Sequence, residues 1–402
     1  MATLDVDFLI MGGGVAGAAC AALLARQGHQ VGLIDARRPR FEPASGEFDL
    51  RVVAISPGSR RILAAAGAWD RLEPARLAAY RSMQVRSGAF GVDFEAADHG
   101  LAELGWIVEI PALEMALWQA LERMPRIELV APASWASVEQ GAETVRVKLA
   151  DGGTVRAGVL VAADGARSRL RHLAGLATDE WHYNQRALVG PVRTEQANTG
   201  LAWQRFTEHG PLALLPLPDG RSSIGWSQPS QRSETLSQQT AEAFLAELNR
   251  HQDSPLGAGV EVGERRTLAL VRRRARQLVQ HRIVLLGDAA RSVHPLAGQG
   301  LNLGLMDAAA LAESLENRTA QDPSLALTNY QRWRLSGGSL IGGGIHAINE
   351  TTRLPGGLGR HALAAGFKLA ARAWPLREAF VQRACGIDSD SPRLARIGSP
   401  AQ

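Results

Sequence analysis

The feature that most constrains the fold is the N-terminal run "VDFLIMGGGVAGAACAALLARQGHQVGLIDAR", in which a glycine turn follows a short apolar stretch. Residues 6–11 predict a strand, residues 15–27 predict a helix that ends at Gly28, and residues 31–34 predict a second strand that Asp35 closes. A strand, a crossover helix and a second strand form a βαβ unit, whose strands are parallel. The run therefore predicts an α/β fold.

The glycine turn has the spacing of a dinucleotide site. Gly12, Gly14 and Gly17 form G-x-G-x-x-G between the strand and the helix. The first glycine permits the tight turn, the second lets a pyrophosphate approach the backbone, and the third lets the helix pack on the strand. The helix N-terminus offers free N–H groups to the phosphates, and Asp35 can accept hydrogen bonds from a ribose. A plain packing turn is the alternative, and this motif alone does not separate FAD from NAD.

Bulk properties exclude several classes of protein. The chain of 402 residues exceeds one typical domain, and its net charge of +4 comes from scattered arginines without the aromatic-basic pattern of a nucleic-acid site. Two cysteines, Cys20 and Cys385, cannot form a disulfide framework or a metal cage, which fits a reducing cytoplasm. We find no signal peptide, no apolar run long enough to span a membrane and no metal-ligand cluster.

Two further motifs bear on the cofactor. "LVAADGARSRLR" places Asp164 and Gly165 after an apolar strand, although an ordinary strand-ending turn would look similar. "IVLLGDAARSVHPLAGQGLNLGLMDAAALAE" crowds glycines into the start of a helix, where each costs about 1 kcal/mol against alanine. Gly298 and Gly300 would let backbone N–H groups approach a ligand closely, and the helix dipole favours negative charge there.

Together the three motifs resemble the FAD-dependent aromatic hydroxylases of group A, the p-hydroxybenzoate hydroxylase type. The resemblance implies an α/β fold with a Rossmann-type FAD-binding domain, an inserted antiparallel-sheet substrate domain and C-terminal helices. The implied FAD-binding domain is discontinuous and comprises residues 1–78, 107–177 and 267–330. The substrate domain would comprise 79–106 and 178–266, and the C-terminal helical region 331–402.

The resemblance also implies site residues. Asp288 would lie beside the flavin ribityl chain, the glycine loop would pass along the ring, and Arg51 would reach the cofactor. The implied cofactor contacts are Gly12, Gly14, Gly17, Asp35, Arg51, Asp164, Gly165, Gly287, Asp288, Gly298, Gln299, Gly300 and Asn302. His294 and Pro295 lie on the loop expected to face the substrate, where His294 could assist phenol deprotonation or simply bind the loop backbone. Two positions depart from the family: Arg291 stands where histidine is common, and Ile110 where a polar residue is common.

A finer resemblance, to the ubiquinone-biosynthesis hydroxylases, rests on runs such as "LRVVAISPGSRRIL", "RFTEHGPLALLPLPDG", "HPLAGQGLNLG" and "YQRWR". It implies ring hydroxylation of a polyprenylated phenol or quinol with O2 and NAD(P)H, through a C4a-hydroperoxyflavin. NADH or NADPH would bind only transiently, since no second glycine fingerprint follows a strand. A flavin-dependent isoprenoid reductase and a non-catalytic scaffold that holds FAD and prenyl lipid are the alternatives.

The remaining expectations concern the sheet and the C-terminus. Trp203, Phe206, Leu214 and Trp226 alternate along expected strands, and either roof the substrate pocket or pack in the core. Helices are expected at 233–250, 323–350 and 361–385. The last is basic, with Leu363, Phe367, Leu369 and Trp374 largely on one side, so it either packs on the FAD domain or contacts an anionic membrane or a partner enzyme. We expect a cytoplasmic protein, with peripheral association to the inner face of the membrane or to a ubiquinone-biosynthesis enzyme complex as a possibility.

Overall fold

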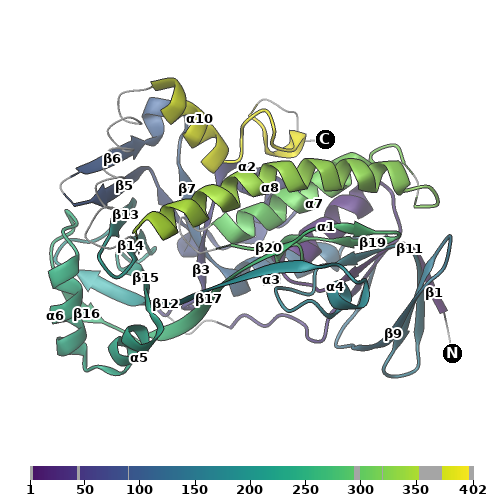
Figure 1. Cartoon of the computed structure of the whole chain (residues 1–402), viewed down its shortest axis with the longest axis horizontal. Coiled ribbons are helices and arrows are strands. Elements are labelled where there is room, and N and C mark those ends of the chain that lie inside the picture. The colour runs from purple at the N-terminus through teal and green to yellow at the C-terminus, as the bar shows by residue number, and fades with distance from the viewer. Residues whose placement is uncertain are drawn as a thin grey trace.

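The computed structural model describes residues 3–42, 46–88, 90–293, 299–318, 320–352 and 374–397, with the backbone alone at 338–350, 352 and 374–376. Figure 1 shows two main sheets at opposite ends of an elongated molecule, joined by long strands and covered by helices. The predicted α/β fold class is confirmed.

The first sheet contains the predicted βαβ unit. β1 (Thr3–Met11) pairs in parallel with β2 (Val31–Ile34) and with β11 (Thr154–Ala162), and α1 (Val15–Arg26) crosses between the first two. In the register, Met11 lies opposite Ile34 and Ala162. The carboxyl ends of the three strands therefore meet at one edge, and the glycine turn, Asp35 and Asp164 all follow that edge.

The other strands of this eight-stranded sheet complete the order β18-β19-β11-β1-β2-β8, with β10 pairing β11 and β9 pairing β10. Their bounds are β8 (Ile127–Val130), β9 (Trp135–Gln140), β10 (Val145–Leu149), β18 (Val279–Gln280) and β19 (Ile283–Leu285). Strands β9, β10 and β11 form the antiparallel meander that the sequence predicts around Gly141 and the Asp151-Gly152 turn.

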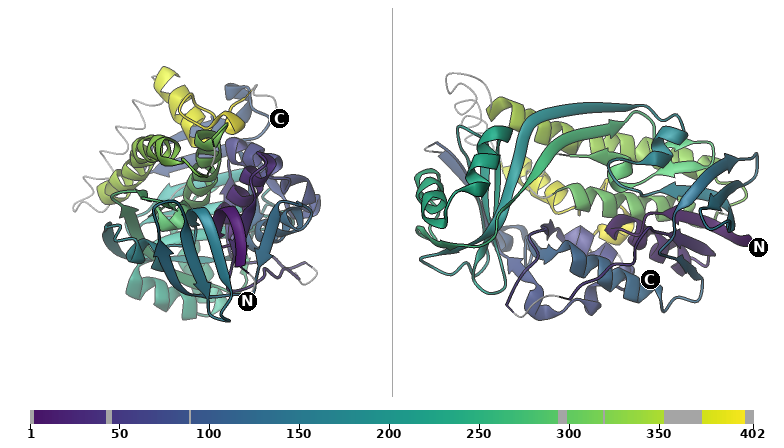
Figure 2. Two further views of the ribbon diagram at one scale, coloured as in Figure 1. Left: turned by 90° about the vertical axis from the view of Figure 1, so that its right-hand side faces the viewer. Right: turned by 90° about the horizontal axis from the view of Figure 1, so that it is seen from below.

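The second sheet is nine-stranded and runs in the order β20-β17-β12-β15-β14-β13-β5-β6, with β16 pairing β12. Its strands are β5 (Ser82–Ser87), β6 (Phe90–Glu95), β12 (Thr178–Thr194), β13 (Leu201–Phe206), β14 (Pro211–Pro216), β15 (Ser222–Pro229), β16 (Gly259–Val262), β17 (Arg266–Ala275) and β20 (Arg291–Ser292). The long pair β12 and β17 spans the molecule in the right-hand view of Figure 2. A third sheet of β3 (Val52–Ile55), β7 (Gly105–Glu109) and β4 (Ala78–Tyr80) lies near the middle.

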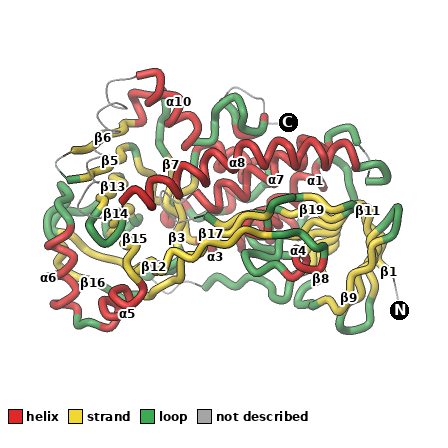
Figure 3. The backbone as a smooth tube through the Cα atoms, viewed as in Figure 1, coloured by secondary structure: helices red, strands yellow, loops and turns green. Residues whose placement is uncertain are grey.

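Helices cover both ends of the molecule. They are α2 (Pro57–Ala65), α3 (Ile110–Leu121), α4 (Arg169–Leu173), α5 (Ser230–Gln238), α6 (Ala241–His251), α7 (Gln299–Leu315), α8 (Ser324–Thr352) and α10 (Trp374–Ala384), with 3₁₀ turns η1 (Trp69–Arg71), η2 (Pro74–Arg76), η3 (Ala96–His99), η4 (Gly287–Ala289) and η7 (Arg393–Ala395). Figure 3 shows α7 and α8 running together along the molecule. The main core lies between the first sheet and its helices, where Phe8, Leu24 and Ile283 are fully buried.

Local signals place most of these helices. Ser56 caps α2 by accepting from the backbone N of Ser59 at 3.3 Å, Pro57 occupies the first turn and Gly67 adopts a positive φ of 78° after the helix, and these are the residue types that local sequence rules place at such positions. The single helix predicted over 233–250 is wrong: α5 and α6 are separate, because Gln239 is extended and Thr240 caps a new helix. Among the described residues no helix is long and apolar enough to cross a bilayer.

The described part of the C-terminal region packs on the protein. Of the helix predicted over 361–385, residues 361–373 with Leu363, Phe367 and Leu369 lie outside the described residues, and α10 begins at Trp374. Val381 and Cys385 are buried, and the carbonyl of Cys385 accepts from the backbone N of Gly58 at 2.9 Å. For this stretch, packing within the chain is therefore the better of the two predicted alternatives.

Candidate active site

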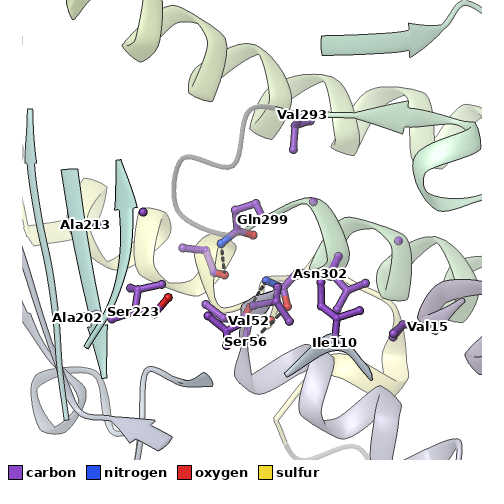
Figure 4. Close-up of a pocket in the computed structure, with 18 of the residues that line it drawn as sticks. Val15, Val52, Ser56, Ile110, Ala202, Ala213, Ser223, Val293, Gln299 and Asn302 are labelled. Carbon is purple, nitrogen blue, oxygen red and sulfur yellow. Dashed lines mark hydrogen bonds between the residues drawn. The ribbon is translucent and has the colours of Figure 1, made fainter. Parts of the chain in front are cut away.

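One cavity of about 650 Å³ lies between the carboxyl edge of the first sheet and the inner face of the second. Residues from the first and third motifs line it together with small side chains of the second sheet, and Figure 4 shows Val15, Asn302, Ala202 and Ser223 around the same space. The predicted site residues that line it are Gly14, Gly17, Gly165, Gly287, Asp288, Gln299, Gly300 and Asn302.

Two helices begin at this cavity. α1 starts after Gly14 and α7 starts at Gln299, and residues of both first turns line the wall. The first N–H groups of a helix have no partner inside the helix, and the helix dipole places positive charge there. The cavity is therefore suited to a ligand that carries negative groups at two separate places.

The three glycines of the first motif have different roles. A Cβ on Gly17 would lie 2.0 Å from the carbonyl O of Gly12, and Gly12 itself has φ +112° against the Ala163 backbone. Both are fixed by close packing inside the protein. Gly14 differs, because a Cβ there would meet nothing within 4 Å. The protein around this position leaves room for a side chain, which fits a phosphate that approaches the backbone.

The glycine turn is held by a residue that the sequence did not reveal. The indole N of Trp118, in α3, donates to the carbonyl of Gly13 at 2.7 Å. Asp35 accepts from the backbone N of Gly13 at 2.6 Å and from that of Arg37 at 2.9 Å, so it fixes the turn although it does not line the cavity. A tryptophan in an amphipathic helix gives no sequence signal for such a contact.

Charged residues gather at one end of the cavity, around Glu114. Burial raises the pKa of Glu114, while Arg37 and Arg51 oppose that rise and Asp35 adds to it. The structure does not bring Arg51 into the cavity: its side chain is about half exposed and pairs with Asp49 at 3.2 Å, although Leu50 and Val52 on either side line the wall.

Asp288 reaches the cavity from η4. Its side chain is accessible through the cavity, yet the surrounding protein raises the pKa of its carboxyl by burial. Arg273 opposes that rise and Asp307 adds to it. The structure therefore presents this carboxyl group to the ligand space.

The second motif supports the third. Ser168 caps α4 by accepting from the backbone N of Arg171 at 3.0 Å, and the buried Arg171 guanidinium donates to the carbonyl of Ala289 at 2.8 Å. Asp164 accepts from the backbone N of Leu170 at 3.3 Å, and its other oxygen is buried without a partner among the described residues. Gly165 lines the wall with φ +83°.

The residues at the start of α7 use their side chains on the protein. Asn302 accepts from the backbone N of Ser56 at 3.0 Å and donates to the carbonyl of Ala54 at 2.9 Å, while Gln299 donates to the carbonyl of Ala384 at 3.4 Å (Figure 4). These bonds hold the N-terminus of α7 against β3 and α10. His294, Pro295 and Gly298 lie outside the described residues.

A buried ion cluster lies beneath the third motif. Asp307, fully buried in α7, binds Arg291 at 2.8 Å, Arg334 at 2.6 Å and the backbone N of Gly287 at 3.2 Å. Arg291 therefore occupies its unusual position as a partner of Asp307, and opposite charge raises its pKa despite its burial. Ile110, the other departure, is an apolar part of the cavity wall.

Two of the four bulky residues expected along the sheet, Leu214 and Trp226, do not line the cavity and pack with Phe244 and Leu248 of α6. Trp203 belongs to the same cluster and also lines the cavity. The inner face carries Ala187, Ala202, Gln204, Ala213, Ser223, Gly225 and Ser227. Outside the cavity, the side chains of Glu208, His209 and His251 have potential metal-binding atoms within 4.8 Å of one another. The sequence did not indicate this cluster.

These features fit FAD. Gly14 and the N-terminus of α1 are suited to a pyrophosphate, and the accessible Asp288 is suited to a ribityl chain. The N-terminus of α7 is suited to a flavin ring, since a Cβ on Gly300 would meet nothing nearer than a Val293 methyl at 3.9 Å. The site and fold define a protein that binds FAD. The model of a family described as an FAD binding domain matches residues 5–338.

Comparison with known proteins narrows the class. The chain is 34% identical over 350 residues to the 3-demethoxyubiquinol 3-hydroxylase of Escherichia coli strain K12, covering 86% of this chain and 89% of that one. It is 35% identical over 405 residues to the ubiquinone hydroxylase UbiL of Rhodospirillum rubrum, covering 97% and 92%. The structure of pqsL, a probable FAD-dependent monooxygenase from Pseudomonas aeruginosa, superposes with a TM-score of 0.75 at 23% identity, over 90% of this chain and 99% of that one. The chain therefore belongs to the FAD-dependent monooxygenases, in the family that includes the ubiquinone-biosynthesis hydroxylases.

Replacement of Asp288 by alanine is expected to weaken FAD binding by more than about tenfold, because it removes a charge-assisted acceptor worth about 1.5–3 kcal/mol. In the FAD-free protein, the same replacement should not lower the stability of the fold. A raised carboxyl pKa favours the fold while Asp288 is protonated, and that contribution is lost as pH rises through the folded-state pKa. At neutral pH the Tm of the FAD-free variant should equal or exceed that of the wild type. Titration with FAD and thermal unfolding measure both effects. Asp5→Ala, at an exposed pair, is the control.

The flavin is expected to be bound without a covalent bond. Cys385 lines the cavity, and burial, with a smaller effect of Glu378, raises the pKa of its thiol to about 12. The thiol is therefore protonated at neutral pH and a poor nucleophile. After acid precipitation all flavin absorbance should remain in the supernatant, and flavin that stays with the pellet would contradict this expectation.

Proposed function

We propose that the protein hydroxylates the aromatic ring of a polyprenylated phenol or quinol in ubiquinone biosynthesis, with O2 and NAD(P)H as co-substrates. The observation that supports this most is that one cavity joins the glycine turn at the start of α1 and the start of α7 to the inner face of the second sheet. A reductase of isoprenoid double bonds and a non-catalytic scaffold are less well supported, since the relatives named above are hydroxylases.

Bound FAD would supply the activation of O2 and the transfer of one oxygen atom to an electron-rich ring carbon. The chain's own contribution is to orient the ring and exclude water. The cavity wall formed by the second sheet is largely apolar, with Val189, Ala202, Ala213 and Leu215 presented by neighbouring strands. Such a wall excludes water from the reacting atoms.

Two polar side chains on that wall are suited to hold the substrate's oxygen groups. Gln204 and Ser223 are buried, line the cavity, and make no side-chain hydrogen bond within the described part of the chain. Both line the cavity, so a ligand bound there can hydrogen-bond to them. We assign to Gln204 and Ser223 the binding of the phenol hydroxyl or of its ring neighbour.

The decisive experiment is an assay of the purified holoprotein with NADH or NADPH, a prenylated phenol and labelled O2. The proposal requires a hydroxylated product that contains the label and nicotinamide oxidation that the phenol stimulates. Saturation of a prenyl double bond without label would indicate the reductase, and a lack of any turnover would indicate the scaffold. Gln204→Leu should raise KM for the phenol without loss of FAD.

We propose further that the substrate domain comprises residues 79–106 and 178–266, inserted into an FAD-binding domain of 1–78, 107–177 and 267–330, with a helical region from 331. Strands β5, β6 and β12 to β16 lie within the proposed substrate domain and share one sheet, which supports this division, while β17 and β20 of the segment 267–330 extend the same sheet. Contact with other ubiquinone-biosynthesis enzymes would give a lipid-like substrate a direct route between active sites.

Weak peripheral binding to anionic membranes is the last element of the proposal. Arg360, Lys368 and Arg372 supply cations in a stretch outside the described residues. We expect the holoprotein to co-float with vesicles containing anionic lipid at low salt, and the bound fraction to fall as salt is added, because screening shortens the reach of each cation. Charge reversal at Arg360 and Lys368 should abolish flotation. Binding that is unchanged in high salt would contradict the electrostatic part of this proposal.

A further inference from the structure

The size of the cavity limits how much of a lipid-like substrate it can enclose. About 650 Å³ is ordinary for one drug-sized ligand, and the flavin-facing walls and the ring-facing walls belong to the same space. If the proposed function holds, as this inference assumes, the flavin and an aromatic ring share that space. A tail of several isoprene units must then leave the cavity through an opening with apolar walls.

The cavity wall differs in polarity from one part to another. Near Glu114, the charges of Arg37, Arg51 and Asp35 act on the wall. An isoprenoid tail would lose hydrophobic contact there. Another part of the wall comes from β5, β6 and α10, where the apolar residues Met83, Phe94, Phe380 and Val381 form the lining.

Phe380 marks an opening in this apolar part of the wall. Seven large apolar side chains are exposed among the described residues: Leu173, Trp181, Val260, Leu268, Leu325, Phe380 and Ile397. Of these, Phe380 alone lines the cavity, and it is 58% exposed. A side chain that touches both the cavity and the solvent stands at a mouth, and an apolar one favours an apolar ligand there.

The mouth has a second wall that polar contacts hold in place. Phe94 of β6 faces Phe380 with ring centroids 6.0 Å apart, and the Arg377 guanidinium lies over the Phe94 ring at 5.3 Å. Arg377 also donates to the carbonyl of Asp93 at 2.5 Å, and His99 binds Glu378 at 2.6 Å. These contacts tie α10 to β6 and η3 on both sides of the phenylalanine pair.

We propose that the isoprenoid tail of the substrate leaves the cavity along the Phe94–Phe380 pair, against the exposed face of Phe380, and that these two residues determine selectivity for tail-bearing phenols. The aromatic pair offers two apolar faces without hydrogen-bond groups, which suits a chain of repeated isoprene units. The ring-binding residues on the inner sheet face remain independent of this mouth, because they lie on other strands.

The test compares Phe380→Glu with wild type on two probes, 2-farnesylphenol and 2-methylphenol, in the FAD-loaded protein. A charge at the mouth should raise KM for 2-farnesylphenol by about tenfold or more, because burying a carboxylate beside an apolar tail is costly. KM for 2-methylphenol and the FAD content should stay at the wild-type value. Phe380→Leu should restore the preference for the tail, and Leu325→Glu, an equally exposed position on α8 away from the cavity, is the matched control.

The KM values of the two probes support or overturn the proposed mouth at Phe94 and Phe380. An unchanged KM for the farnesyl probe, or an equal rise for both probes, overturns it. If wild type hydroxylates neither probe, the proposed function fails instead. In that case the affinities of both probes for wild type and for Phe380→Glu, measured through flavin fluorescence, test the proposed mouth. Selective loss of farnesyl binding in Phe380→Glu supports the mouth, and its absence overturns it.

Discussion

Replacing Gly14 with valine is expected to yield a folded protein that does not retain FAD. The backbone at Gly14 is extended, with φ −65° and ψ 175°, and an added Cβ meets no protein atom within 4 Å, so valine does not disturb the FAD-free fold. The same side chain would occupy the place where a phosphate approaches the N-terminus of α1. We expect the affinity for FAD to fall by about a hundredfold or more, since the phosphate contacts are lost together.

Flavin absorbance after purification, a titration with FAD and the Tm of the FAD-free protein measure this result. Gly17→Val provides the contrast, because a Cβ there lies 2.0 Å from the carbonyl of Gly12 and the fold itself should fail. Stoichiometric FAD in Gly14→Val would refute the assignment of this turn to the pyrophosphate.

Replacing Asp307 with alanine should cause a large loss of stability. The change leaves Arg291 and Arg334 buried without a counter-charge and removes the acceptor of the Gly287 N–H. Removal of one partner from a buried ion pair costs about 3–5 kcal/mol. Urea unfolding of the FAD-free protein measures this loss directly, and a protein that does not fold at all would agree with it.

Glu261→Ala is the control for this prediction. Glu261 pairs with Arg193 at 2.9 Å, but both side chains are more than half exposed, at 67% and 56%. Exposed pairs contribute about 0–1 kcal/mol. If Asp307→Ala were as mild as Glu261→Ala, the cluster beneath the third motif would not hold that turn.

The sequence predicts the parts of this fold that local chemistry determines. The βαβ unit, the Ser56–Pro57 helix start and the meander over β9 to β11 follow from turn residues and periodicity, and the structure confirms them. The break between α5 and α6 also had a signal, since Thr240 is a good capping residue three positions before Ala243. A continuous polar helical pattern concealed it.

Other features depend on which distant segments meet, and no local pattern carries that information. Alternation of side chains along β13 to β15 separates the two faces of the sheet, but both faces are buried. The pattern therefore does not show which face packs on α6, as Trp226 does, and which faces the cavity, as Ser223 does. The same holds for Trp118 beside Gly13 and for Arg291 beside Asp307. Hydrophobic patterns identify which residues are in the core but not which residues they contact.

The position of α10 has a consequence for how the protein is made and degraded. Val381, Ala384 and Cys385 close the cavity, and they come after every other wall residue in chain order. During synthesis the flavin pocket can therefore be completed only after the whole FAD-binding sheet has left the ribosome. A protease that cuts before α10 would leave a chain with an intact glycine turn and an open pocket, so early cleavage should release the cofactor before it unfolds the sheet.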